Sequence, residues 1–272
     1  MSLSLDVINS LQLHINQCDH RILGPKWKLT NVTVPYSKLY YIKSGSGFLL
    51  VDGAYIHLEP GYVYLTPSGT TVSCGCTSLE KLYFHISVRA IDSEDLLGRI
   101  HGICRLPFSE DTYAALLACW NAEQYTDLIR LRSLLMETVL AFLDTFPPAD
   151  FSLRQYSDTV RRALTHIHEK PRANLTAARI AELLYISEST LRKAFLAETG
   201  KNLGQYIDEA VLLKAAQLLV SESMPVHDIS ARLGFCDQFY FSRRFKQRYR
   251  MTPTQYRKRN QYLINEQLKM NN

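Results

Sequence analysis

The stretch GFCDQFYFSRRFKQRYRMTP, residues 234–253, places six aromatic side chains among five Arg and Lys residues. This mixture of residue types suits two different roles. The rings can stack on unpaired bases while the cations bind phosphates, as in proteins that hold single-stranded nucleic acid. Alternatively, some rings form the buried face of a helix and the cations lie on its exposed face. The periodicity of the stretch and its surrounding elements separate these two interpretations.

Helical periodicity divides the aromatic residues of this stretch into two groups. At about 100° per residue, Phe241 and Phe245 share one face, which predicts that both are core residues. Phe235 lies in the turn before the helix and is also expected to be buried. The exposed face and the first turn then hold a mixed polar set, which consists of Gln238, Phe239, Ser242, Arg243 and Lys246. Phe239 is the exception, because it is a ring on the polar face.

The same pattern occurs once before in the chain. SESTLRKAFLAETG, residues 187–200, aligns with DQFYFSRRFKQRYR, residues 237–250, at an offset of fifty. Upstream, RIAELLYIS aligns with DISARLGFCD, which has one more residue in the turn. Ser187 and Asp237 are the residue types that cap helix N-termini. Each copy therefore predicts a helix-turn-helix motif.

A pair of such motifs predicts major-groove recognition. One face of each second helix packs on its scaffold, through Leu191 and Phe195 in the first copy. The other face offers Arg and Lys for guanine and Gln for adenine, and Ser or an apolar ring for other edges. On this face the first copy carries the polar residues Ser189, Arg192 and Lys193. Positioning on phosphates alone is the alternative for this first helix.

Length and charge indicate two domains with different partners. The chain has 272 residues, which suits two domains. Residues 1–150 hold 11 Lys and Arg against 15 Asp and Glu, a net charge of −4, whereas residues 151–272 hold 20 against 11, a net charge of +9. The basic half is therefore expected to meet a polyanion, unless the charge is a solvated face.

Targeting signals are not evident at the N-terminus. MSLSLDVINSLQLHINQ lacks a basic start followed by a long apolar run. Residues 60–79 carry no charge, but Pro, Gly, Ser and Thr are too frequent there for a membrane helix. The six cysteines are scattered, as in a reduced compartment. We expect a cytoplasmic protein, associated with the nucleoid when bound to DNA, with no membrane partner.

The N-terminal half changes its pattern near residue 109. Residues 28 to about 90 contain short runs of Tyr, Ile, Val, Leu and Phe separated by Ser-Gly, Asp-Gly and Pro-Gly, which predicts a small barrel or sandwich. Residues 111–120 and 124–146 show helical periodicity, with one stripe formed by Leu128, Leu131, Leu135, Val139 and Phe142. The stripe packs on the sheet or on a second subunit. FPPAD, residues 146–150, begins a linker.

Residues 158–257 resemble the DNA-binding domain of the AraC/XylS family of bacterial regulators. LTAARIAELLYISESTLRKAFLAETGKNLGQYI is similar to its first helix-turn-helix, and PVHDISARLGFCDQFYFSRRFKQRYRMTPTQYR is similar to its second. The resemblance implies promoter DNA as ligand, RNA polymerase as partner, activation of transcription, and base contacts from the residues named above. One departure is Val211, where the family often has Arg in the linking helix.

Residues 28–90 resemble the cupin-like effector arm of the same family. The resemblance implies a cavity for a small effector, a sugar or related metabolite. The homodimer is expected instead from the two helices appended to the barrel, which expose a second face. The implied fold class is α+β and multidomain, with a cupin-like β-barrel, two appended helices, and an all-α domain whose two helix-turn-helix motifs share a linking helix. The expected segments are an effector domain at 1–108, a dimerisation region at 109–147, a linker at 148–156 and a DNA-binding domain at 157–264.

Enzymatic alternatives fit the sequence less well. Metal-binding cupins place several His and a Glu on neighbouring strands, whereas only His57 and His85, with Glu59 nearby, fall on the predicted strands. Repair methyltransferases with this DNA-binding domain need four N-terminal cysteines, and only Cys18 lies in the first seventy residues. We therefore expect no catalytic residue, metal or cofactor. A cupin-type isomerase or oxygenase, and a regulator without a small-molecule ligand, remain as alternatives.

Overall fold

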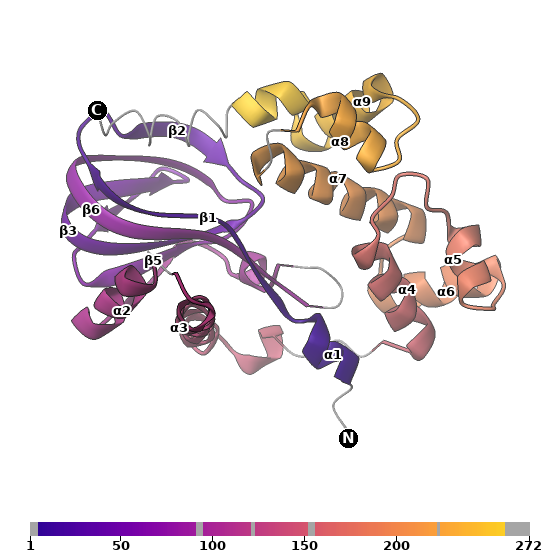
Figure 1. Cartoon of the computed structure of the whole chain (residues 1–272), viewed down its shortest axis with the longest axis horizontal. Helices are drawn as coiled ribbons and strands as arrows, with labels where there is room; N and C mark the ends of the chain where they lie inside the picture. The colour runs from indigo at the N-terminus through magenta and orange to yellow at the C-terminus, as the bar shows by residue number, and fades with distance from the viewer. Residues whose placement is uncertain (1–4, 91–94, 121–122, 152–155, 222–223, 259–272) are drawn as a thin grey trace. The chain divides into compact units, whose positions relative to one another are not determined.

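The computed structural model describes residues 5–90, 95–120, 123–151, 156–221 and 224–258. The chain forms two compact units, of which the first contains the described residues up to Phe151 and the second those from Tyr156. The first unit is built on an antiparallel sheet and the second is helical (Figure 1). The expected α+β fold class is confirmed. Within the described ranges, no helix is long and apolar enough to cross a membrane.

The first unit contains a seven-stranded antiparallel sheet. Strand β6 runs down its middle and pairs with β1, β2 and β3, while β3 also pairs with β4 and β5, and β5 with β7. Asp52 and Gly53 form the two-residue β3–β4 turn, both with positive φ (49° and 83°), as this kind of hairpin requires. The strands are β1 (Gln12–Leu23), β2 (Lys28–Thr33), β3 (Ser37–Val51), β4 (Ala54–Leu58), β5 (Tyr62–Thr66), β6 (Thr71–Arg89) and β7 (Cys104–Pro107).

The sheet extends further in both directions than the sequence predicted. Strands were expected from residue 28, but β1 begins at Gln12 and pairs with β6 over its whole length. Strand β7 lies beyond residue 90 and continues the edge formed by β5. His14 and His20 therefore also lie on a strand, so His57 and His85 are not the only strand histidines. Strand β1 is largely half-buried with polar residues throughout, which hides the alternation that reveals a strand.

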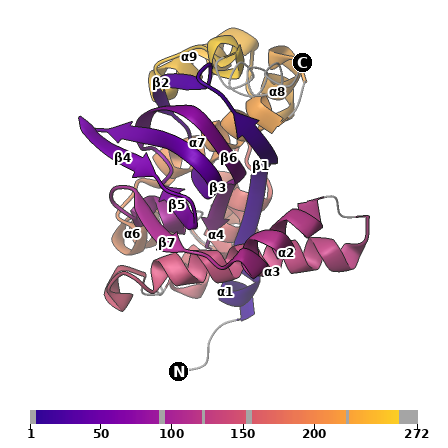
Figure 2. The same cartoon turned by 90° about the vertical axis from the view of Figure 1, so that its left-hand side faces the viewer.

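The two central strands present different side chains on their two faces. Leu39 and Tyr41 of β3, with Leu82 and Phe84 of β6, are fully buried in the core shared with the two helices that follow the sheet. These helices are α2 (Glu110–Trp120) and α3 (Tyr125–Leu143), and they lie along one side of the sheet (Figures 1 and 2). The opposite face carries Tyr40 and Tyr83 in a separate core cluster. Short helices α1 (Leu5–Ser10), η1 (Leu96–Arg99) and η2 (Pro148–Phe151) complete the unit.

The apolar stripe of α3 packs on the sheet of its own chain. Leu131, Leu135, Val139 and Phe142 are buried in the same core as Leu39 and Phe84. The Tyr41 hydroxyl donates a hydrogen bond of 2.7 Å to Thr138 Oγ1, which fixes the helix on the sheet. Leu128 is 47% exposed and does not belong to this core. The intramolecular interpretation of the stripe is therefore confirmed for four of its five residues.

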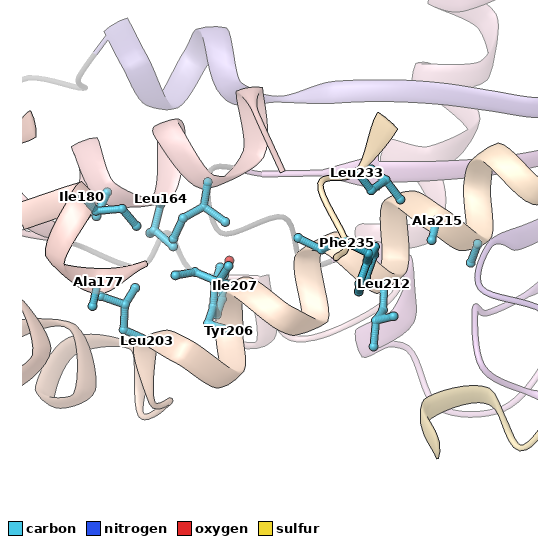
Figure 3. Close-up of a cluster of buried hydrophobic side chains, with 14 of the residues drawn as sticks. Leu164, Ala177, Ile180, Leu203, Tyr206, Ile207, Leu212, Ala215, Leu233 and Phe235 are labelled. Atoms are coloured by element: carbon cyan, nitrogen blue, oxygen red, sulfur yellow. The ribbon is translucent and has the colours of Figure 1, made fainter. Parts of the chain in front are cut away.

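The second unit is a helical domain with one continuous core. The longest helix, α7, carries Leu203, Tyr206, Ile207, Leu212 and Ala215, which pack against side chains from the helices and turns on both sides of it (Figure 3). These shared contacts make α7 the scaffold of the domain. The helices are α4 (Asp158–Glu169), α5 (Ala177–Leu183), α6 (Glu188–Thr199), α7 (Leu203–Ser221), α8 (Val226–Arg232) and α9 (Gln238–Tyr249).

Candidate nucleic-acid interface

The sequence repeat corresponds to two copies of one structural unit. Helix α5 precedes α8 by 49 residues, and α6 precedes α9 by 50, so the extra residue lies in the second turn, as the alignment predicted. Both predicted caps are present. Ser187 Oγ accepts the backbone N–H of Thr190 at 3.1 Å, and Asp237 Oδ1 accepts that of Tyr240 at 2.7 Å. The bond from Tyr240 lowers the pKa of the Asp237 carboxyl. Each second helix therefore begins at a fixed residue.

Left-handed residues shape the two units at equivalent points. The first turn contains Tyr185 at φ 57°, where the second contains Gly234 at φ 74°. At the end of the second helix, the first copy has Gly200 at φ 69° and the second copy has Arg250 at φ 59°. Left-handed backbone favours glycine, because a Cβ is crowded there. Each copy therefore satisfies one of its two left-handed positions with glycine and holds a larger residue in the other.

The aromatic residues of α9 hold the helix on its scaffold. Phe241 and Phe245 are fully buried, and Phe235 in the turn lies 4.9 Å from the Phe241 ring. Phe245 also contacts the rings of Tyr249 and Tyr256. The predicted core positions of Phe235, Phe241 and Phe245 are confirmed. A helix held by three buried rings offers them to no ligand, so the stretch that contains them is not a stacking platform.

The outer face of α9 is basic and partly hollowed. Asp237, Phe239, Ser242, Arg243, Lys246 and Thr252 line a shallow hollow of about 480 Å³. Phe239 is 82% exposed, which places a ring on the polar face as predicted. No acidic residue occurs from Gln238 to Arg250, whereas five Arg and Lys residues do. This face therefore combines positive charge with an apolar contact and two polar side chains in the first turns.

The outer face of α6 is more balanced in charge. Ser189, Arg192 and Lys193 are exposed, and Leu196 beside them is 52% exposed. Arg192 pairs with Glu188 at 2.6 Å, one turn earlier on the same helix. Ser189 Oγ lies 3.0 Å from Ser187 Oγ. Two of the three expected contact residues are thus engaged in local bonds, which a ligand would have to replace.

Helix α7 carries two links to the second motif that the sequence did not reveal. Arg244 of α9 forms an ion pair with Asp208. Arg257 donates from Nε to the carbonyl of Leu219 at 3.2 Å and from Nη2 to that of Met224 at 2.5 Å. The bond to Leu219 satisfies a carbonyl in the last turn of α7, which the helix itself leaves unpaired. The sequence offered no sign of these bonds beyond two Arg residues, Arg244 and Arg257, without an assigned role. Their partners lie more than thirty residues away along the chain.

Val211 and the candidate metal residues are also placed by the structure. Val211 is buried, so the family departure in α7 replaces a polar position with an apolar core contact. His57 is exposed on β4, whereas His85 is buried on β6. Over the described part of the chain, no group of three or more His, Cys, Asp and Glu side chains is placed to hold a metal ion.

The second unit thus consists of two helix-turn-helix units joined by α7. A helix-turn-helix domain family matches residues 180–259. The chain is 30% identical to the transcriptional regulator GadX of Escherichia coli O6:H1 over 137 residues, 50% of this chain and 50% of GadX. It is 22% identical to the lactose operon transcription activator of Staphylococcus xylosus over 91% of this chain and 92% of that protein. The second unit is therefore similar to the helix-turn-helix domains of known transcriptional regulators.

Among solved structures, the chain is similar to ToxT from Vibrio cholerae. It is 16% identical, covers 89% of this chain and 97% of its own, and has a TM-score of 0.47. The GadX match spans about half the length of that relative.

Proposed function

We propose that this protein is a sequence-specific regulator of transcription that binds double-stranded promoter DNA through α6 and α9. The observation that supports the proposal is the repeated unit, in which each second helix buries one face and exposes a polar one. Two recognition helices fixed on one scaffold suit successive major-groove turns, roughly 34 Å apart on one side of the duplex. The proposed role is non-enzymatic.

The base-reading residues proposed on α9 are those at its first turns and outer face. Arg243 has the bidentate geometry that suits guanine, and Gln238 suits adenine. Phe239 can contact a thymine methyl group, and Ser242 can meet either kind of edge. Lys246 suits a phosphate. On α6 the proposed contacts are Ser189, Arg192 and Lys193, and the pairing of Arg192 with Glu188 favours a smaller share of sequence reading there.

Selection of DNA from a random pool tests this function directly. The full chain would be incubated with random duplexes at physiological salt, and bound duplexes would be amplified over several rounds. We expect enrichment of a site with two conserved blocks about one helical turn apart. A pool that remains random after selection would contradict the proposal, because nonspecific phosphate binding enriches no sequence.

The first unit is proposed to bind a small effector, a sugar or related metabolite, and to control DNA binding or activation of RNA polymerase. A ligand can do this only by binding one of two states more tightly than the other. A homodimer through the 109–147 region is proposed as well. Ile129 of α3 is 65% exposed, and an exposed apolar residue on a packed helix suits a second subunit. Sedimentation of the wild type and Ile129→Glu tests this, with a concentration-independent monomer as the contradicting result.

A further inference from the structure

A buried lysine without a hydrogen-bond partner lies on the sheet face opposite α2 and α3. Lys81 is fully buried on β6, and its Nζ forms no hydrogen bond within the described residues. The amine lies 3.5 Å from the Tyr40 ring centroid, 4.1 Å from that of Trp27 and 5.3 Å from that of Tyr83. Rings stabilise a cation by about 0.5–2 kcal/mol each, whereas an uncompensated buried charge costs several. The aromatic contacts therefore offset this cost only in part.

Charges around Lys81 do not supply the missing anion. Strand register places Arg21 beside Lys81 on β1 and Ile42 beside it on β3. Arg21 is itself paired with Asp19. Among the groups whose charge acts on Lys81 are Lys38, which is also a cation, and the thiols of Cys74 and Cys76, whose pKa values are raised by burial. Burial is also the main cause that lowers the pKa of Lys81 to about 7.

Other polar atoms near Lys81 are also buried and form no hydrogen bond within the described residues. Among them are Trp27 Nε1, which is a donor, and His85 Nε2, which lies four residues along β6 from Lys81. Gln17 donates to the Tyr83 hydroxyl at 2.8 Å, so its Oε1 accepts from His85 Nδ1 at 3.1 Å. Burial and the nearby lysines hold the His85 pKa well below its usual value. The ring is therefore neutral, and its Nε2 is an acceptor without a donor.

These three atoms together indicate which hydrogen-bonding groups a ligand at this place would need. We define the Lys81 cage as Trp27, Tyr40, Lys81, Tyr83 and His85. Tyr40 connects its two ends, because its ring lies 3.5 Å from Lys81 Nζ and 6.3 Å from the His85 ring. At one end, the donors Lys81 Nζ and Trp27 Nε1 have no acceptor within the described residues. At the other end, the acceptor His85 Nε2 has no donor there. Aromatic faces between them suit the apolar face of a small ring or chain.

We propose that the Lys81 cage binds a small hydroxy-carboxylate, a sugar acid in size and character. Its carboxylate accepts from Lys81 Nζ and Trp27 Nε1, and a hydroxyl donates to His85 Nε2. This inference rests on the proposed effector role of the first unit and names the chemical class of its ligand. A buried polar group without a partner is costly, so a ligand that pairs all three atoms removes that cost when it binds.

Matched probes test the proposal on the full chain. D-glucuronate would be compared with D-glucose, which has the same ring without the carboxylate, by thermal unfolding at equal ionic strength. We expect glucuronate to raise the melting temperature and glucose to raise it far less, since ligands stabilise the native state by mass action. An equal shift with glucose, or no shift with glucuronate, would overturn the proposal.

Substitutions inside and outside the Lys81 cage test whether glucuronate binds there. Lys81→Met keeps the length of the side chain and removes the charge, and we expect at least a tenfold loss of glucuronate affinity. Lys43→Met is the matched control, because Lys43 lies on β3 outside the cage and pairs with Glu110. Equal affinities of Lys81→Met and wild type would overturn the assignment.

Proton uptake on binding can be measured on the wild type alone, so this test does not depend on whether a variant folds. Pairing with a carboxylate raises the pKa of Lys81 from about 7, so binding at pH 8 should take up protons. Calorimetry in two buffers of different ionisation enthalpy measures this uptake, and its absence would contradict the pairing. Enrichment of a DNA site by the same preparation shows that the proposed function stands even if glucuronate does not bind.

Discussion

Individual side chains separate the recognition role of α9 from its structural role. Phe239 and Phe245 belong to one helix, yet the first is 82% exposed and the second fully buried. An exposed ring contributes little to folding, whereas truncation of a buried ring costs transfer free energy and leaves a cavity. The two residues therefore give matched substitutions with opposite expectations.

Phe239→Ala should weaken specific DNA binding and leave the free energy of unfolding within about 0.5 kcal/mol of wild type. Phe245→Ala should lower that free energy by about 3–5 kcal/mol. Urea unfolding and fluorescence anisotropy with the selected site measure the two effects. Comparable unfolding losses for both variants would contradict the assignment of Phe239 to the interface.

Arg243→Ala should cost about 1–3 kcal/mol in binding to the selected site and relax the preference at one base pair. The reason is loss of a bidentate contact, which Arg243→Lys should restore only in part. Anisotropy on single-base variants of the site measures the loss. Arg162→Ala, an exposed Arg on α4, is the control. A uniform loss at every site variant would instead assign Arg243 to a phosphate.

Lys81→Met should raise the stability of the ligand-free protein. The folded pKa is about 7 against an ordinary 10.5, so the unfolded state binds more protons between these values and stability rises with pH. The free-energy cost of burying the protonated amine is complete below pH 7 and disappears as the pH rises towards 10.5. We expect the variant to gain on the order of a few kcal/mol at pH 7 and little at pH 10. Urea unfolding at both values tests this, and a variant less stable than wild type at pH 7 would contradict it.

The turns of the two helix-turn-helix units each contain one residue with left-handed backbone, but the residue type differs between them. Gly234 has φ 74°, and a Cβ built there would lie 3.0 Å from Asn174 Oδ1. Tyr185 occupies the equivalent place at φ 57° and is 92% exposed. Left-handed backbone costs a residue with a Cβ roughly 1–2 kcal/mol. The first turn therefore stores strain that the second avoids.

Gly234→Ala should lower the free energy of unfolding by about 1–2 kcal/mol, since it adds strain and crowds Asn174. Tyr185→Gly should instead leave it unchanged or raise it by up to about 1 kcal/mol, because relief of strain is offset by chain entropy. Chemical denaturation measures both. Destabilisation by Tyr185→Gly as large as that by Gly234→Ala would show that the tyrosine ring contributes packing that its exposure does not suggest.

At the scale of the whole molecule, charge is distributed unequally along the chain. Residues 151–272 carry 20 Lys and Arg against 11 Asp and Glu. Affinity for DNA should fall linearly with the logarithm of salt concentration, with a slope of about −0.9 for each phosphate neutralised. Lys246→Ala should reduce that slope by about one and weaken all sequences alike. Anisotropy across a salt series tests this, and an unchanged slope would remove Lys246 from the phosphate contacts.

Local sequence patterns predicted the double motif and the inward face of α6 and α9. Repeat spacing, caps and a 3.6-residue period are local, so they are readable without contacts between distant residues. Leu191, Phe195, Phe241 and Phe245 are buried as the periodicity predicted. The left-handed Gly234 lies in the turn that the alignment marked. These features follow from local backbone geometry and need no knowledge of the fold.

Contacts between residues far apart in the sequence were not predictable and became known from the folded structure. Strand β1 escaped prediction because its burial pattern follows neither common period. The Asp208–Arg244 pair and the Arg257 bonds join residues more than thirty positions apart. The Lys81 cage depends on strand register, which places Tyr40 opposite Tyr83, and on the connection between β1 and β2, which brings Trp27 over the amine. Register is set by pairing between strands rather than by local sequence, and for that reason the candidate ligand site was invisible until the sheet was assembled.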